Sequence, residues 1–440
     1  MIRGALVFAL GFGASASGAV DRSIRPEMRT PVEKAVFETA IGLSSSIRPM
    51  LRPVTQIVAD PSEDTPVTHQ RFQNWIGAFK TRAIAQGISP GVLDAAFDGV
   101  RYDSDVIKRD RNQSEFTKTI WEYLDSAASD TRIANGKTAL ASHRSTLEAI
   151  EERYGVEKEV VVAIWGLESA YGSYRGRSDV IRSLATLSFD GRRGAFFEQQ
   201  LIAALKILQN GDTTARNMTG SWAGAMGHTQ FIPTSYLDYA VDFTGDGRRD
   251  IWADDPSDAL ASTAAYLKRF GWEKGQPWGV EVRIPEGFDY RQAKRSITKD
   301  PSAWAQLGVV DMNGRAVPDH GPAAVLLPAG GEGAAFLIFD NFAVIERYNT
   351  ADAYVIGVGH LSDRITGKPA IQASWPRQDR ALTLKERKEL QTRLTTRGFD
   401  TKGIDGKIGP LTIEAVRSFQ IANGLKPDGY ASLYILEKLR

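Results

Sequence analysis

The segment Val160-Val-Val-Ala-Ile-Trp-Gly-Leu-Glu-Ser-Ala-Tyr-Gly172 places one acid, Glu168, in an almost continuous apolar run. The run is too short to span a bilayer but long enough for a helix buried in a core. An apolar setting disfavours the charged form of a carboxyl group, so the sequence predicts a raised pKa for Glu168. A carboxyl group still protonated near neutral pH can serve as a general acid, as breaking a glycosidic bond requires. The alternative is a half-exposed acid at a helix end with no chemical role.

The composition is that of an ordinary globular protein, with 440 residues, 42% hydrophobic and 24% charged. Lys plus Arg (54) nearly balances Asp plus Glu (53), so net charge gives no reason to expect a nucleic acid or an anionic membrane as partner. There are no cysteines, which excludes disulfides, thiolate metal sites, a cysteine nucleophile and a lipid anchor on an N-terminal cysteine. The five histidines show no metal-ligand spacing.

The first residues are typical of an export signal. Arg3 is followed by the apolar run 5–12 and by Ala14-Ser-Ala16, which predicts a signal peptide over residues 1–16. No later run is long enough for a transmembrane helix. We therefore expect a soluble periplasmic protein, associated with the cell wall and without a membrane anchor in the mature chain. Residues 17–68, rich in Ser, Arg and Pro, are expected to form a flexible linker.

The spacing of apolar residues divides the rest of the chain into regions of different expected structure. Residues 72–155 repeat apolar side chains every three or four positions, which predicts helices. Alternating and short apolar runs predict a small β-subdomain at about 278–348. Residues 367–381 are expected to be a second linker. The segment 382–440 predicts three short helices around a small core, which is more plausible as a binding module than as a catalyst.

A second unusual segment is GSWAGAMGHTQFIPTSY at residues 220–236. Its small residues allow the backbone to approach another surface closely. Ser221 and Gln230 lie among aromatic residues, a composition suited to an extended polar ligand such as a sugar. A tight structural turn before a helix explains the same pattern equally well.

The following segment, DFTGDGRRD at 242–250, matches the first half of a calcium-binding loop. Gly247 stands where the loop needs a sharp turn. The usual bidentate glutamate is missing, since Ala253 occupies its position, so a longer loop would have to close with one of Asp254, Asp255 and Asp258. The alternative is an acidic surface turn.

Residues 72–364 resemble the B-type lytic murein transglycosylases, and residues 384–439 resemble the three-helix peptidoglycan-binding domain. The second resemblance rests on Ile404-Asp-Gly-Lys-Ile-Gly-Pro-Leu-Thr412. The first rests on AIWGLESAYG (163–172), the segment 220–236 with DFTGDG (242–247), and RYN (347–349). The resemblance implies an α+β, mostly helical, lysozyme-like catalytic domain at 69–366 and a peptidoglycan-binding domain at 382–440.

The resemblance also implies a reaction. Glu168 would be the single general acid/base that cleaves the bond between N-acetylmuramic acid and N-acetylglucosamine without water. The C6 hydroxyl of the sugar would attack, leaving a 1,6-anhydromuramic end. Such chemistry agrees with the lack of a carboxylate partner near Glu168 in sequence, because glycoside hydrolases usually need two. A true muramidase and a catalytically silent peptidoglycan-binding scaffold are the alternatives.

The roles of further residues follow from the same resemblance. The expected substrate-binding residues are Ser221 and Gln230 near Glu168, Arg192 and Arg193 at peptide or lactyl carboxylates, and Tyr266, Tyr348, Asn349 and Tyr354 along the glycan groove. The expected ligands of a structural Ca²⁺ or Na⁺ are Asp242, Thr244, Asp246, the carbonyl of Arg248, and Asp258. No cofactor is expected for the chemistry itself. The expected partners are peptidoglycan strands and proteins of cell-wall synthesis or division.

Overall fold

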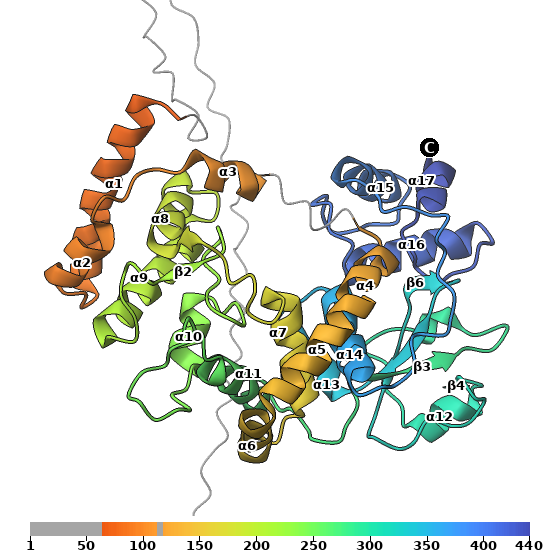
Figure 1. Cartoon of the computed structure of the whole chain (residues 1–440). Coiled ribbons are helices and arrows are strands. Elements are labelled where there is room, and N and C mark those ends of the chain that lie inside the picture. The colour runs from red at the N-terminus through yellow and green to blue at the C-terminus, as the bar shows by residue number, and fades with distance from the viewer. Residues whose placement is uncertain (1–63, 112–117) are drawn as a thin grey trace, which may run out of the picture. The chain divides into compact units, whose positions relative to one another are not determined.

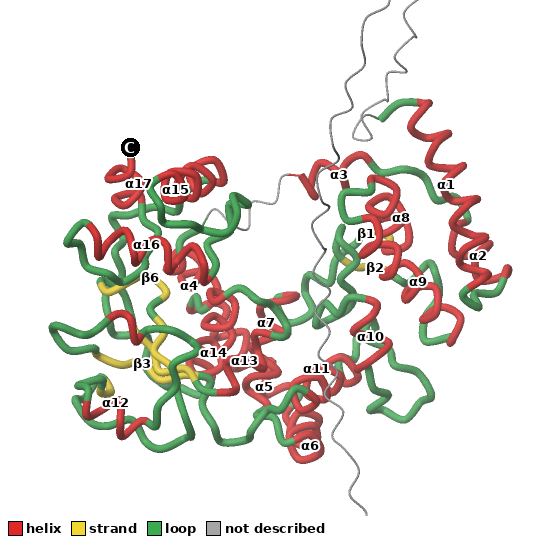
Figure 2. The backbone as a smooth tube through the Cα atoms, turned by 180° about the vertical axis from the view of Figure 1, so that it is seen from behind, coloured by secondary structure: helices red, strands yellow, loops and turns green. Residues whose placement is uncertain are grey.

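The structure is a computed structural model that describes residues 64–111 and 118–440. The predicted signal peptide and nearly all of the predicted linker at 17–68 lie outside the described residues. Helices dominate. Most of the few strands gather in one region, and a separate two-stranded pair lies among the helices (Figures 1 and 2). No helix among the described residues has the length and apolar character needed to cross a membrane.

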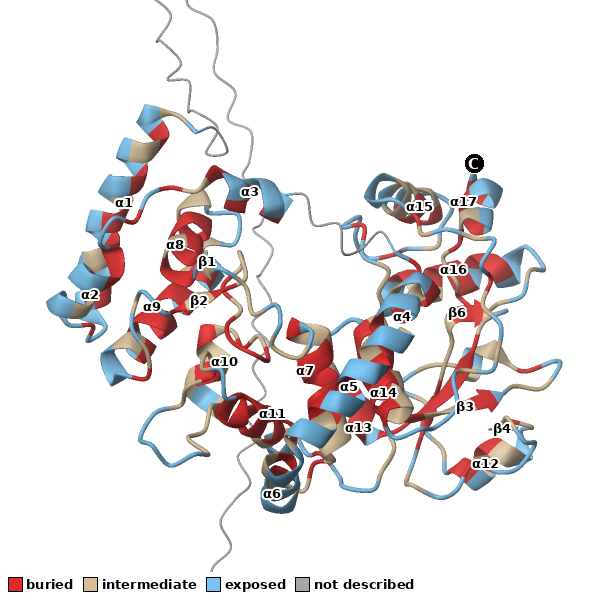
Figure 3. Ribbon diagram, viewed as in Figure 1, coloured by how far each residue is buried: buried red, intermediate tan, exposed pale blue. Residues whose placement is uncertain are grey.

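The helix that carries Glu168, α7 (Lys158–Ser169), lies in the centre of the core. All residues from Val160 to Gly166 are buried, and α7 packs against α5 (Asp130–Ser142), α6 (Arg144–Tyr154), α11 (Ser257–Arg269) and α14 (Asp352–Ile365). A helix enclosed by neighbours on several sides needs apolar residues on all of its faces, which explains the continuous run in the sequence. Figure 3 shows this buried centre against the exposed outer faces of the surrounding helices.

A second group of helices packs around α8 (Val180–Asp190) and α9 (Gly194–Asn210), two adjacent helices in strong contact. The group also contains α1 (Pro66–Ala85), α2 (Pro90–Phe97), α3 (Ser104–Arg111) and α10 (Pro233–Tyr239). Two short strands border this group in the sequence. β1 (Ser178–Asp179), just before α8, pairs antiparallel with β2 (Thr219–Gly220), which follows α9. The backbones come so close that a Cβ on Gly176 would lie 2.2 Å from the carbonyl carbon of Gly220, so glycine is required there.

The small sheet confirms the predicted change of period. Its antiparallel strand order is β4-β3-β7-β5, and Val280 of β3 lies opposite Leu337 of β7. The strands are β3 (Gly279–Arg283), β4 (Val310–Asp311), β5 (Ala324–Leu326) and β7 (Ala335–Ile338), accompanied by β6 (Pro328–Gly331), α12 (Pro301–Gln306), α13 (Asp340–Glu346) and the 3₁₀ turn η2 (Tyr290–Gln292). Trp304 of α12 is fully buried under the sheet. The sequence pattern did not predict α12 or β4.

The C-terminal domain has its own core, built by α15 (Leu384–Thr396), α16 (Pro410–Ala422) and α17 (Leu433–Leu439). It is held against the β-subdomain by polar bonds, among them Lys294 to Glu414 at 2.6 Å and the Gly331 N–H to Asp428 at 3.0 Å. The segment 367–381 is also bonded to the body. Arg377 makes a double hydrogen bond to Asp125 on α4 (Ile120–Ala127). Polar contacts, as well as the linker, thus hold the C-terminal domain to the rest of the protein.

Candidate active site

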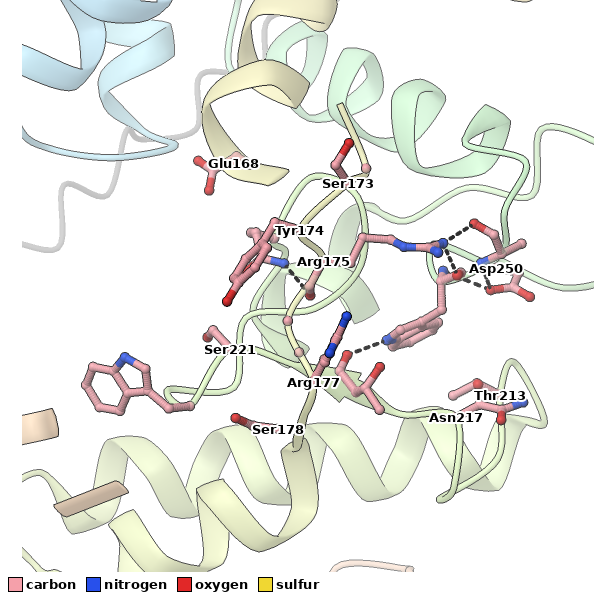
Figure 4. A pocket seen from close by; sticks show the side chains of 18 of the residues that line it. Glu168, Ser173, Tyr174, Arg175, Arg177, Ser178, Thr213, Asn217, Ser221 and Asp250 are labelled. Atoms are coloured by element: carbon pink, nitrogen blue, oxygen red, sulfur yellow. Dashed lines mark hydrogen bonds between the residues drawn. The ribbon is translucent and has the colours of Figure 1, made fainter. Parts of the chain in front are cut away.

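Glu168 stands on the last turn of α7 and is half-buried. It lines a pocket of about 890 Å³ together with Ser221 and Gln230 (Figure 4). The walls come from the turn after α7, from β2 with the loop that comes after it, and from residues 250–253. The structure therefore brings the acid of the apolar segment and the polar pair of the glycine-rich segment to one cavity, as the sequence predicted.

Tyr354 on α14 holds the Glu168 carboxyl group directly. Its hydroxyl donates a hydrogen bond of 2.6 Å to Oε1 of Glu168. Burial, together with the charge of Glu168, raises the pKa of Tyr354 well above its ordinary value, so the phenol stays protonated and remains a donor. This bond orients the Glu168 carboxyl group at the pocket.

The other three residues expected along the glycan groove make hydrogen bonds to backbone groups. The Tyr348 hydroxyl donates to the Thr229 carbonyl at 2.6 Å, and the Tyr266 hydroxyl donates to the Arg347 carbonyl at 2.7 Å. Asn349 accepts the backbone N–H of Ala351 ahead of α14. None of these three residues, nor Tyr354, is among the described residues that line the Glu168 pocket. Their contact with substrate stays a prediction, while their bonds position α14 and the loop before it.

Ser221 and Gln230 each present one group to the pocket. The Ser221 oxygen accepts the backbone N–H groups of Ala223 and Ala225, which leaves its O–H as a donor. The Gln230 amide nitrogen donates to the carbonyls of Arg175 and Gly227, which leaves its side-chain oxygen as an acceptor. Gln230 adopts φ 55, a strained conformation that persists where surrounding bonds enforce it.

Arg192 and Arg193 are not brought into this pocket. Nε of Arg192 donates to the buried carboxylate of Asp110 at 2.8 Å. The guanidinium of Arg193 lies 4.5 Å from the centre of the Phe196 ring and also faces Phe197. Both arginines have structural partners within the described residues, so the geometry gives no support to their predicted contact with substrate carboxylates.

A network around His228 joins α7 to the neighbouring loops, and sequence reasoning missed it. Trp165 on α7 donates to Nδ1 of His228 at 3.1 Å, so the imidazole proton must sit on Nε2, which lies 2.7 Å from the Ala253 carbonyl. Arg175 donates to the same carbonyl and to that of Trp252. The partners are 25 to 78 positions apart, and no local pattern reveals such contacts.

The acidic loop forms a cluster suited to a cation. Ligand oxygens of Asp242, Asp246 and Asp258 lie within 4.8 Å of one another. Asp258 is 3% exposed and accepts the backbone N–H groups of Phe243, Thr244 and Asp250. Burial raises its pKa, because an uncompensated charge is disfavoured there. Three carboxylates, one of them buried, are a donor set that fits a hard cation such as Ca²⁺.

Comparison with known proteins identifies the family. The sequence model of the transglycosylase SLT domain matches residues 71–363. The chain belongs to this family. The model of a peptidoglycan binding domain matches residues 383–439. The SLT-domain match contains the whole pocket around Glu168, the Tyr354 bond and the acidic loop, so the pocket is that of an SLT-domain transglycosylase.

Relatives of this transglycosylase cover different parts of it. The membrane-bound lytic murein transglycosylase B of Escherichia coli (strain K12) is 34% identical over 240 residues, which are 53% of this chain and 63% of the relative. The match thus spans less than two thirds of that relative. The crystal structure of SltB3 from Pseudomonas aeruginosa in complex with NAG-anhNAM-pentapeptide is 49% identical, with a TM-score of 0.82, and covers 84% of this chain and 99% of that chain. The lytic transglycosylase Slt35 of Escherichia coli in complex with calcium is 28% identical, with a TM-score of 0.57, and covers 68% of this chain and 93% of that chain. The α+β lysozyme-like fold expected from the sequence is confirmed.

Burial of His228 predicts how the stability of this transglycosylase depends on pH. Burial lowers the pKa of His228 in the folded protein, whereas the unfolded chain keeps a pKa of about 6.5. The unfolded state therefore binds more protons in acid. The free energy of unfolding should be fully kept above about pH 6.5 and fall as the pH drops below it. Urea denaturation at about pH 7.5 and about pH 5.5 tests this: a His228→Gln variant should show a smaller loss than the wild type, and an equal loss would contradict the assignment to His228.

Proposed function

We propose that this SLT-domain protein is a peptidoglycan lytic transglycosylase. It cleaves the β-1,4 bond between N-acetylmuramic acid and N-acetylglucosamine without water, and Glu168 is its single general acid and base. The observation that carries the proposal is the half-buried Glu168 carboxyl in the pocket, held by the Tyr354 hydroxyl at 2.6 Å. The SltB3 complex with an anhydro-sugar peptide gives independent support, because the relative is 49% identical to this chain.

The pocket offers little for hydrolysis. Among its described lining residues, only Glu168 and Asp250 carry a carboxylate. Oδ1 of Asp250 accepts the backbone N–H groups of Trp252 and Ala253, so this acid closes a turn. Hydrolytic glycosidases usually pair an acid with a second carboxylate that activates water or attacks the sugar. Because Asp250 closes a turn, Glu168 is the one described acid of the pocket assigned to the chemistry, which favours attack by a hydroxyl of the substrate itself.

The proposed reaction moves one proton in each of two steps. Protonated Glu168 gives its proton to the glycosidic oxygen, so the bond to C1 of the muramic sugar breaks and the N-acetylglucosamine hydroxyl leaves. The acetamido group stabilises the electron-poor C1. The Glu168 carboxylate then removes the proton of the C6 hydroxyl while that oxygen bonds to C1. The acid is restored, the 1,6-anhydro ring is formed and no water is consumed.

The Tyr354 hydrogen bond contributes to both steps. It orients the carboxyl group and supplies a charge-assisted bond to the carboxylate that exists between them. Ser221 and Gln230, with one donor and one acceptor, would bind hydroxyl or acetamido groups of the sugars in the pocket.

The location and partners belong to the same proposal. An exported protein working in the periplasm would meet its substrate there. The domain at 383–439 would bind peptidoglycan and keep the pocket near glycosidic bonds that are not yet cleaved, which raises the local substrate concentration. Proteins of cell-wall synthesis or division would be further partners.

We also propose a structural cation in the acidic loop, with Asp242, Asp246 and Asp258 as ligands and with Thr244 and the Arg248 carbonyl completing the set. The calcium complex of Slt35 supports it. When bound, the cation would supply stability through charge compensation and no step of the reaction. Ca²⁺ at about one hundred times its Kd should raise the free energy of unfolding by about 2.7 kcal/mol. Thermal unfolding with Ca²⁺ or with chelator measures this.

Two loop variants make the cation test specific. The double substitution Asp242→Asn and Asp246→Asn should abolish the response to Ca²⁺. The matched control, Asp254→Asn, lies in the same loop with its side chain 99% exposed and outside the cluster, and should keep the response. If Asp254→Asn instead loses the response to Ca²⁺, then Asp254, and not Asp258, is the last acidic ligand of the cation.

The reaction is tested by mass spectrometry of fragments released from purified peptidoglycan. Fragments lighter by one water and inert to borohydride are expected, because an anhydro end is not a reducing end. Hydrated, reducible fragments would establish a muramidase. Binding without release of fragments would establish a scaffold.

A further inference from the structure

One arginine of the β-subdomain joins the ends of two helices. Arg295 lies in the segment after η2, and its guanidinium donates to Oε1 of Glu346 at 2.5 Å and to Oδ1 of Asp352. The same guanidinium lies 5.0 Å from the centre of the buried Phe342 ring. Glu346 is the last residue of α13 and Asp352 is the first of α14, two adjacent helices (Figure 1). One side chain thus spans the corner between them.

The corner needs a cation because it brings two carboxylates together. Burial raises the pKa of Asp352, the charge of Arg295 opposes that shift, and the charge of Glu346 adds to it. A guanidinium suits the position, since its several N–H groups can bind two carboxylates at once and its flat face can stack on a ring. Without Arg295, two like charges would repel each other across the corner and push the start of α14 away from the end of α13.

The corner leads directly to the acid in the pocket. Tyr354 follows Asp352 by two positions in the first turn of α14, and its hydroxyl donates to Glu168 at 2.6 Å. α14 also packs against α7, the helix that carries Glu168. A side chain in the first turn of a helix moves with the start of that helix, and a shift of about 1 Å at a catalytic group can cost a large part of the rate. The position of the start of α14 therefore decides whether the Tyr354 hydroxyl reaches Glu168.

Arg295 does not reach the pocket that contains Glu168. Arg295 and Asp352 line a separate cleft of about 720 Å³, whose other walls come from the start of α4, the strand β5 and the C-terminal domain. Neither residue is among the described residues that line the Glu168 pocket. A change at Arg295 should therefore alter the group that holds Glu168 and leave the binding of substrate in the pocket intact.

We propose that Arg295 is a positioning residue for the catalytic acid. It neutralises Glu346 and Asp352, holds the start of α14 in place, and so keeps the Tyr354 hydroxyl on Glu168. The inference rests on the proposed function, since it takes Glu168 as the acid. It adds that the β-subdomain contributes to the reaction through one arginine, which no sequence motif marks and which lies outside the pocket.

The first test separates kcat from KM in the steady-state release of soluble fragments from peptidoglycan. Arg295→Gln should lower kcat by about five- to tenfold, because two partly exposed ion pairs are lost, and should change KM by less than about twofold. Arg295→Lys should lose less than Arg295→Gln, since one ion pair remains. The control Arg291→Gln, an exposed arginine paired with Asp289 in the same subdomain, should behave as wild type. Unchanged kcat in Arg295→Gln, or a loss that appears only in KM, would overturn the proposal.

A double-mutant cycle tests whether Arg295 acts through Tyr354. In a Tyr354→Phe background the hydroxyl is already absent, so adding Arg295→Gln should change kcat by less than about twofold. A residue that only stabilises the fold would lower kcat by the same factor in both backgrounds, and that result would overturn the proposal. The same cycle with Arg295→Lys gives the answer if the glutamine variant is too unstable to purify.

Removal of the repulsion should restore activity. The double variant Arg295→Gln with Asp352→Asn leaves Glu346 without a like charge beside it, so kcat should return to within about twofold of the wild-type value. A double variant that is as slow as Arg295→Gln alone would contradict the proposed role of charge at the corner.

Crystal structures of the wild type and of Arg295→Gln separate failure of the inference from failure of the proposed function. The distance from the Tyr354 hydroxyl to the Glu168 carboxyl group is read without turnover and does not depend on the nature of the product ends. It should increase from hydrogen-bonding range to more than about 3.5 Å in the variant. An unchanged distance overturns the inference even where the rate falls. Fragments with reducing ends from the wild type overturn the proposed function and leave this distance to decide the role of Arg295.

Discussion

Replacing Glu168 with glutamine is expected to lower the rate of fragment release from peptidoglycan by at least about 10²–10⁴-fold, the contribution typical of general acid–base catalysis. Glutamine cannot give up or take up the proton, but its side-chain oxygen can still accept the Tyr354 hydrogen bond. The fold and the binding of peptidoglycan should therefore be retained. Fragment release, thermal unfolding and cosedimentation with sacculi measure these three properties.

The matched control is Asp250→Asn, the other acid among the described residues of the pocket. Asparagine keeps the acceptor for Trp252 and Ala253, so this variant should fold and remain active. If Asp250→Asn is as inactive as Glu168→Gln, the pocket works with two carboxylates and the protein is a hydrolase. If Glu168→Gln still releases fragments at the wild-type rate, Glu168 is not the catalytic acid.

Removing the Tyr354 hydroxyl should have the second largest effect on activity. A hydrogen bond to a charged group contributes about 1.5–3 kcal/mol, so Tyr354→Phe should lower kcat by roughly tenfold to a hundredfold, provided the bond acts in the transition state. Loss of both kcat and kcat/KM to the same extent is expected, because the tyrosine acts on Glu168 and not on the binding of substrate. Steady-state release of soluble fragments measures both constants.

Tyr236→Phe is the control for stability. Its hydroxyl is also buried and donates to a backbone carbonyl, that of Arg249, so its loss should cost stability without touching Glu168. If Tyr236→Phe has the same stability as Tyr354→Phe and shows the same decrease in kcat, then Tyr354 acts only through the fold. An increase in KM with unchanged kcat would mean that it binds substrate, as the sequence analysis expected.

The sequence was sufficient where a signal is local. The apolar run around Glu168 predicts a central helix because every face of α7 needs apolar contacts. The spacing of Asp242 and Asp246 predicts that these two acids lie close together, since both are on one short segment, and the structure confirms this; the binding of a cation stays a prediction. The last acid stayed open among three candidates. The structure places Asp258 in the cluster with Asp242 and Asp246, because the start of α11 buries it against the N–H groups of the loop.

The sequence was insufficient where partners are far apart along the chain. Tyr354 and Glu168 are 186 positions apart, and their bond depends on the packing of α14 against α7. The same holds for Arg192: the residue type suits a substrate carboxylate, and only the structure shows that Nε of Arg192 donates to the buried carboxylate of Asp110.

In the proposed mechanism, Glu168 transfers protons within the substrate and water takes no part. Digestion of peptidoglycan in H₂¹⁸O, followed by mass spectrometry of the released fragments, tests it most directly. We expect fragments with anhydro ends and no ¹⁸O, and we expect digests with the Glu168→Gln variant to lack these fragments. Fragments that carry ¹⁸O at a new reducing end, in proportion to the labelled water, would contradict it.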